Sequence, residues 1–156
     1  MNRKWIFLLV VLCVSFFTIA SVSATDFTNH DFHGYFSMKV PADVSFEEDF
    51  NESSEDGINQ IFATYMSENV VIMYTDSIAY SDNSSVFFYQ TFFESINPES
   101  VGCYESQEGN LTILEATTND GSEASLVGLC NGNKMIVVVG DDVEVIKTMA
   151  RSAEFG

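Results

Sequence analysis

Positive charge is scarce in this chain. Its 156 residues include six Lys and Arg and two His against 23 Asp and Glu, so the net charge is −17 at pH 7. An excess of negative charge repels the phosphates of nucleic acids and the headgroups of anionic lipids. We therefore expect no nucleic-acid partner, and membrane contact only if the N-terminal segment described below is retained. A basic protein, a basic surface component or a divalent cation is the favoured partner.

Histidine is almost absent, and the common catalytic motifs are missing. The only two histidines are His30 and His33, and the chain has no Gly-x-Ser-x-Gly, His-Glu-x-x-His or glycine-rich phosphate loop. Hydrolases of the usual types hold a histidine against a nucleophile on a rigid scaffold. The sequence therefore predicts a protein that is not an enzyme and needs no cofactor. A pair of carboxylates is the alternative source of acid–base chemistry.

The N-terminus has the features of an export signal. Arg3 and Lys4 precede an apolar run over residues 5–19, and Val22-Ser23-Ala24 provides small residues at a cleavage site. This arrangement predicts a signal peptide over residues 1–24 and a secreted or cell-envelope-associated protein. An uncleaved N-terminal membrane anchor is the alternative, although a spanning helix needs about 20 apolar residues.

Residues 25–156 have the length of one domain, and we expect a single acidic α+β domain there. All 23 acidic residues lie in this part of the chain, together with four basic ones. Removing residues 1–24 therefore leaves four positive charges against 23 negative charges, a net charge of −19. The surface of the domain must be strongly acidic.

Cysteine is rare as well. Cys13 lies in the predicted signal peptide, so Cys103 and Cys130 are the only two cysteines of the mature chain. Because disulfides persist outside the cell, we expect these two to pair. Two buried thiols packed as small apolar side chains are the alternative.

Three Asn-x-Ser/Thr sequons follow the export signal. They begin at Asn51, Asn83 and Asn110, where we expect loops or the ends of strands. A bulky glycan is tolerated at such positions. The three asparagines are therefore candidate glycosylation sites.

The order of secondary structure follows from hydrophobic periodicity and turn residues. Residues 25–34 look irregular, and residues 43–57 look like an acidic surface loop. Helical spacing of apolar residues predicts helices over 86–96 and from Asp141 to Arg151. Period-two alternation and turn residues predict strands over 35–40, 58–66, 69–75, 101–107, 111–117, 123–130 and 134–139. The expected fold class is α+β, with a single antiparallel sheet of about six to seven strands and two helices packed on it.

Two short segments carry a resemblance to a known fold family. Phe36-Ser37-Met38-Lys39-Val40-Pro41 resembles the opening strand of Mog1/PsbP-like domains, and residues 145–155 resemble their closing helix and short Ser-x-x-Phe tail. Small secreted archaeal proteins are similar in the same way. The resemblance covers most of residues 35–155. It implies a compact sandwich that binds proteins or ligands and is not a catalyst, and it transfers no functional residue to this chain.

Two groups of residues are candidate metal ligands. His30 and His33, with Asp31 between them, offer imidazole and carboxylate groups that suit zinc. Separately, Glu47-Glu48-Asp49 opens an acidic stretch with the hard oxygen ligands that calcium prefers, but without the regular spacing of an EF-hand loop. Solvated side chains with no bound metal are the alternative in both places.

Aromatic side chains are concentrated in one short segment. Phe87, Phe88, Tyr89, Phe92 and Phe93 exceed what a single buried helical stripe can cover. Exposed members of this set would form an apolar patch of the kind that binds a partner. These five residues are therefore candidate interface residues, unless the helix is buried on two sides.

Two functions are consistent with these features. The first is an exported, non-enzymatic interaction or ligand-binding domain. The second is a small secreted metal-binding protein, for calcium or zinc, or a hydrolase.

Overall fold

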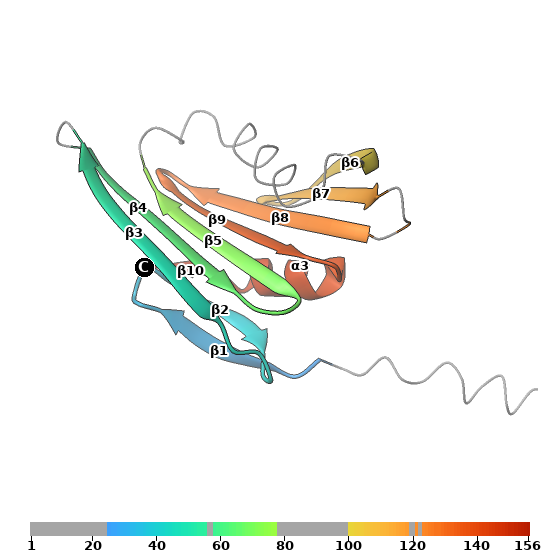
Figure 1. Cartoon of the computed structure of the whole chain (residues 1–156), viewed down its shortest axis with the longest axis horizontal. Coiled ribbons are helices and arrows are strands. Elements are labelled where there is room, and N and C mark those ends of the chain that lie inside the picture. The colour runs from blue at the N-terminus through green and yellow to red at the C-terminus, as the bar shows by residue number, and fades with distance from the viewer. Residues whose placement is uncertain (1–24, 56–57, 78–99, 119–120, 122) are drawn as a thin grey trace, which may run out of the picture.

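The computed structural model describes residues 25–55, 58–77, 100–118, 121 and 123–156. These residues form mostly β-structure around one short helix (Figure 1). The predicted signal peptide, the predicted helix over 86–96 and its five aromatic interface candidates lie outside the described residues. The elements are β1 (Phe27–Phe32), β2 (Phe36–Pro41), β3 (Glu47–Glu55), β4 (Ile58–Met66), β5 (Val70–Asp76), β6 (Ser100–Glu108), β7 (Leu111–Thr118), β8 (Glu123–Asn131), β9 (Lys134–Gly140), α3 (Val143–Arg151) and β10 (Glu154–Phe155).

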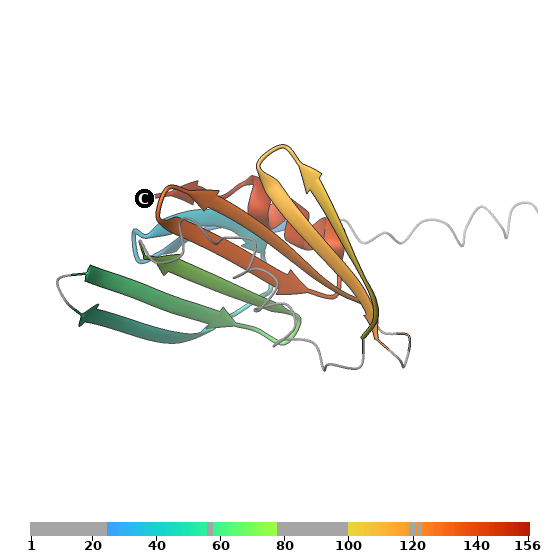
Figure 2. The same ribbon diagram turned by 90° about the horizontal axis from the view of Figure 1, so that it is seen from above.

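The strands form two sheets. The larger one has seven strands in the order β3-β4-β5-β9-β8-β7-β6, and every described neighbouring pair is antiparallel. The smaller one has the order β1-β2-β10. The small sheet and α3 cover the same face of the large sheet, as Figure 1 shows. Figure 2 shows the strong twist between the β3–β4 end and the β6–β7 end.

The main core lies between the large sheet and the elements that cover it. Phe36 and Met38 of β2 meet Ile72 and Tyr74 of β5 there, and Ile146 of α3 is fully buried in the same cluster. β8 and β9 are buried on both faces, because a second cluster around Leu126 and Val137 lies on the opposite side of the sheet. Central strands of this kind contain runs of apolar residues instead of alternation.

Helix α3 forms where the sequence predicts it. Asp142 is the N-cap, and its carboxylate accepts hydrogen bonds from the backbone N–H groups of Glu144 and Val145. Such a cap satisfies donors that the first helical turn leaves without partners. The buried face consists of Ile146, Met149 and Ala150, which pack toward β8 and β9.

The predicted fold class is wrong in two respects. The described chain is mainly β-structure with one short helix, and its strands divide into two sheets instead of one. Residues 27–32 and 47–55, expected to be irregular or a loop, are strands β1 and β3. Both are hydrogen-bonded to a partner strand over their full length, β1 to β2 and β3 to β4. Backbone pairing overrides their polar composition, because strand preference depends strongly on context.

The register of the large sheet gives no support to the predicted disulfide. Cys103 of β6 is paired with Ala116 of β7, which is paired with Ala124 of β8. Cys130 lies six residues farther along β8, which corresponds to roughly 20 Å at the usual rise of a strand. The Cα atoms of a disulfide lie within about 7 Å of each other. In this register β7 lies between the two strands, and the two cysteines are too far apart to form a disulfide.

No helix among the described residues is long and apolar enough to cross a membrane.

Gly140 is a position where the fold requires the absence of a side chain. An added Cβ would lie 2.8 Å from Cγ2 of Ile146 and 3.1 Å from the carbonyl oxygen of Asn69. We expect Gly140→Ala to destabilise the protein by about 1–3 kcal/mol, the usual cost of overpacking a filled core. Urea unfolding measures the change.

Gly102→Ala is the matched control, because an added Cβ there meets no heavy atom within 4 Å. It should change the free energy of unfolding by no more than about 0.5 kcal/mol. Equal effects of the two substitutions would contradict the packing of α3 on the end of β9.

Candidate functional site

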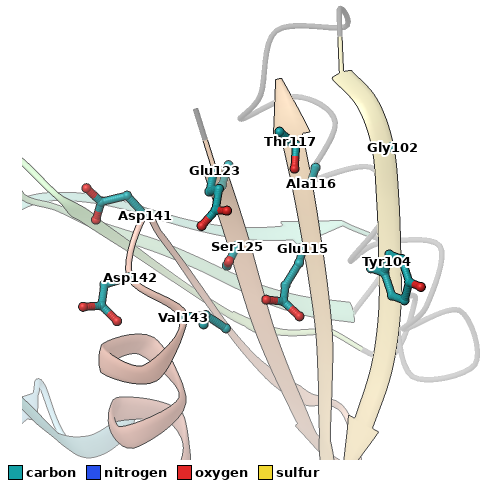
Figure 3. A pocket seen from close by; sticks show the side chains of 11 residues that line it. Gly102, Tyr104, Glu115, Ala116, Thr117, Glu123, Ser125, Asp141, Asp142 and Val143 are labelled. Carbon is teal, nitrogen blue, oxygen red and sulfur yellow. The ribbon is translucent and has the colours of Figure 1, made fainter. Parts of the chain in front are cut away.

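A cleft lies where the β6–β7–β8 end of the large sheet meets the start of α3 (Figure 3). Its volume is about 540 Å³, which is within the range of small-molecule sites. The residues that line it are Gly102, Tyr104, Glu115, Ala116, Thr117, Glu123, Ala124, Ser125, Asp141, Asp142 and Val143.

Strand register brings the polar residues of the cleft together. Tyr104 of β6 is paired with Glu115 of β7, and Glu115 is paired with Ser125 of β8. Directly paired residues point to the same face of a sheet, so these three side chains form one row across three strands. The row continues to Gly140 of β9, after which the chain turns into α3.

A second row lies closer to the end of the strands. Gly102 of β6 is paired with Thr117 of β7, and Thr117 with Glu123 of β8. In Figure 3 the carboxylates of Glu115 and Glu123 point into the cleft, while those of Asp141 and Asp142 point away from these two, on the other side of the helix start. Two neighbouring strands therefore direct two carboxylates into the cleft, and Asp141 and Asp142 add negative charge at the helix start beside it.

No basic side chain lies among the described residues that line this cleft. Lys147 and Arg151 lie farther along α3, and both are bound by Glu108 at the end of β6. The distance from Nζ of Lys147 to Oε1 of Glu108 is 3.0 Å, and a second contact of 3.1 Å joins Lys147 to Glu144. The cations of α3 are therefore held in their own ion-pair network with Glu108 and Glu144, and none of these four residues lines the cleft.

The network changes the titration of its members. Hydrogen bonds from Lys147 and then Arg151 hold the pKa of Glu108 below its usual value of 4.5. The same contact with Glu108, followed by that with Glu144, raises the pKa of Lys147 above 10.5. Charge-assisted hydrogen bonds favour the charged form of each partner.

Tyr104 is the most exposed of the large hydrophobic side chains that the structure describes, with 80% of its surface accessible. It lies on β6 at the edge of the cleft. Such exposure is unusual for a tyrosine in a strand, because aromatic rings normally bury their faces. Here the ring is available to a ligand.

A second, smaller cavity lies on the other side of the helix start. Its volume is about 220 Å³, and Asp43, Val44, Asn69 and Val145 are among its lining residues. Asp141 and Asp142 line this cavity as well as the larger cleft. Negative charge thus continues around the N-terminus of α3.

Two of the six predicted metal ligands are brought together. Nε2 of His33 lies 2.7 Å from Oε2 of Glu48, and this contact joins the β1–β2 turn to β3. His30 instead packs against Phe32, with ring centroids 4.5 Å apart, and a carboxylate oxygen of Asp31 accepts a hydrogen bond from the backbone N–H of Gly34.

Glu47 and Asp49 point away from that pair, since they alternate with Glu48 along β3. Within the described part of the chain, no group of three or more His, Cys, Asp or Glu side chains converges in the manner of a metal site.

The aromatic residues beside this pair form part of the core. Tyr65 packs against Phe32 with ring centroids 4.6 Å apart, and Tyr74 stacks on Phe36 at 5.3 Å. Burial, reinforced by nearby acidic groups, raises the pKa of both tyrosines to about 12. These phenols stay protonated at physiological pH and contribute packing.

Two candidate glycosylation sites lie on the surface. Asn51 is exposed on β3, and Asn110 is exposed in the two-residue turn between β6 and β7. Gly109 makes that turn possible, because its φ of 64° is disfavoured for residues with a side chain. Asn83 lies outside the described residues.

The cleft residues were missed by reasoning from the sequence. A signal was present in β7, where Glu115 follows Leu111 and Ile113 on the core-facing side of the strand. The acidic Glu115 stands where the alternation of β7 predicts a core residue. This indicates that β7 extends beyond the small sheet and α3, which cover that face of the large sheet. Asp141 and Asp142 were interpreted only as a helix start, because their second role depends on β6 and β7 lying beside them.

Comparison with family models, curated proteins and solved structures finds no match to this chain.

The ion-pair network of α3 should be visible in the pH dependence of stability. Because the pKa of Glu108 is lowered in the folded protein, its stabilising effect is present above about pH 4.5 and is lost as the pH falls through the lowered pKa. We expect Glu108→Gln to lower the melting temperature at pH 7. The difference from the wild type should shrink toward zero on acidification, as followed by circular dichroism.

Glu52→Gln removes an exposed acid from β3 and serves as the control. Its melting temperature should stay within about 1 °C of the wild type at pH 7. A difference between Glu108→Gln and wild type that is constant with pH would contradict the ion-pair network.

Proposed function

We propose that this chain is an exported binding domain whose acidic cleft takes up a positively charged organic group of a partner. The observation that carries this proposal is the cleft of about 540 Å³, which has four acidic residues and no basic residue among its described lining, with the carboxylates of Glu115 and Glu123 directed into it. In a chain with a net charge of −17, this is the concave site where negative charge from three elements converges.

The size of the cleft favours a cation of many atoms over a single metal ion. A metal ion needs several oxygen or nitrogen ligands within about 2.6 Å, and no described group of acids or histidines has that arrangement. Carboxylates spread around a large cleft match instead the ammonium and guanidinium groups of a long cationic ligand. The metal-binding alternative is supported here only by the contact between His33 and Glu48.

The physical basis of recognition is electrostatic and aromatic. The Coulomb attraction between an ammonium group and a carboxylate 4 Å apart is about 1 kcal/mol in bulk water. It is about 4 kcal/mol at the effective dielectric constant near a protein surface. The exposed ring of Tyr104 adds a face over which a cation can be placed. No histidine or lysine accompanies Ser125, Thr117 and Tyr104 among the described lining residues, so the cleft favours binding over turnover.

Charge-neutral variants of the cleft test this function. We expect the purified protein to bind spermidine, measured by titration calorimetry, and Glu115→Gln combined with Glu123→Gln to weaken binding at least about 10-fold. Raising the salt concentration to 0.5 M should weaken binding by the wild type as well, because exposed charges are screened.

Glu47→Gln combined with Glu52→Gln is the matched control. It changes the net charge by the same amount on β3, away from the cleft residues. Its affinity for spermidine should stay within about 2-fold of the wild type. If both double variants lose affinity equally, the cation is attracted by the whole surface and the proposed site is wrong.

The ring of Tyr104 is tested separately. Tyr104→Ala should weaken spermidine binding by about 2- to 5-fold, the effect of a cation–π contact at an exposed site. Tyr104→Phe should retain wild-type affinity, since the face of the ring and not the hydroxyl makes the contact. Equal losses in the two variants would assign the effect to the hydroxyl.

A further inference from the structure

The smaller cavity at the start of α3 has a mainly apolar surface. Its lining includes Val70 of β5 and Ile146 of α3, which belong to the main core and are 6% and 0% exposed. Val44 and Val145, both half-buried, line it as well. An apolar cavity of about 150 Å³ can hold benzene, so this cavity of about 220 Å³ has room for a hydrocarbon group of about six carbons.

Three segments that are distant in the sequence provide most of this lining. They are the end of β2 with the turn after it, the turn that leads from β4 into β5, and the start of α3. In the first turn, the N–H of Ala42 donates to the carbonyl oxygen of Asp26 at 2.8 Å. The N–H of Val44 donates to the carbonyl oxygen of Pro41 at 3.2 Å. These hydrogen bonds fix the backbone on both sides of Asp43.

Acidic residues accompany the apolar ones. Asp43 follows β2, Asp141 and Asp142 precede α3, and all three are exposed. No basic residue lies among the described residues that line this cavity. A helix start by itself attracts anions, but the carboxylate of Asp142 already accepts the N–H groups of Glu144 and Val145, and the other two acids repel an anion. The cavity therefore suits a hydrocarbon group that carries a positive charge.

The smaller cavity and the acidic cleft are neighbours. Asp141 and Asp142 line both of them. In Figure 3 the carboxylates of these two residues lie on the other side of the helix start from those of Glu115 and Glu123. A ligand that extends from the cleft around the helix start therefore meets two further carboxylates and then the apolar cavity.

We propose that the smaller cavity receives an aliphatic arm of the ligand whose ammonium groups occupy the acidic cleft. The ligand is then an amphipathic amine, with a hydrocarbon chain of about six carbons attached to a cationic group. Each methylene group that the cavity removes from water contributes about a factor of 4 in affinity. This inference rests on the proposed function, because it specifies the class of cation that the cleft takes up.

Small probes with the same hydrocarbon tail separate the effect of charge from that of the tail. They are hexylammonium, hexanol and hexanoate, and chemical-shift titration by NMR measures their affinities for the purified protein. Hexylammonium should bind about 5-fold more tightly than hexanol because of its attraction to the carboxylates, and hexanoate should not bind. Butylammonium should bind about 10-fold more weakly than hexylammonium, since it buries two methylene groups fewer. Equal affinity of hexanol and hexylammonium, or binding of hexanoate, would overturn the inference.

Two substitutions change the smaller cavity alone, because Asp43 and Val44 do not line the cleft. Asp43→Asn removes one charge and should weaken hexylammonium binding about 5-fold, and Val44→Phe fills the cavity and should weaken it at least about 10-fold. Both variants should bind spermidine within about 2-fold of the wild type, which also shows that they are folded. Asp49→Asn on β3 is the matched control and should leave hexylammonium binding unchanged. Equal losses in Asp43→Asn and Asp49→Asn would assign the attraction to the whole surface and overturn the inference.

Spermidine with a hexyl group on one terminal nitrogen tests both cavities with a single molecule. Calorimetry should show that it binds the wild type at least about 10-fold more tightly than spermidine does, and the gain should disappear in Val44→Phe. No gain in the wild type would overturn the inference and leave the cation site in place. If spermidine itself does not bind, the proposed function is wrong and the inference fails with it.

Discussion

The contact between Gly140 and Ile146 is the constraint on which the rest of the structure depends. Because Gly140 has no side chain, only two residues separate β9 from α3, and the helix packs directly onto the central strands. This placement fixes Asp141 and Asp142 at the helix start, one as the N-cap and both beside the ends of β7 and β8. It also leaves the β6–β7 end of the sheet extending past the helix, where the sheet and the helix start enclose the cleft.

The short helix separates the two signs of charge along its length. Acids occupy its first turn and its cap, where the helix dipole favours them, and Lys147 and Arg151 occupy its later turns. Glu108 binds both of these cations at the end of β6. These two cations therefore neutralise a carboxylate outside the cleft, and Glu115 and Glu123 have no basic residue beside them among the described residues that line the cleft.

Local sequence determined much of the secondary structure and the overall charge. Period-two alternation placed β2, β4, β5 and the four strands from β6 to β9, turn glycines marked the hairpins, and the acids before Val143 marked the start of α3. The division into two sheets, the strands β1 and β3, and the separation of Cys103 from Cys130 were decided by tertiary structure. So was the cleft, whose residues come from three strands and a helix start that are separated by up to 41 positions in the chain. Periodicity and turns are encoded within a few residues, whereas the pairing of distant strands depends on how all the apolar faces can be buried at once.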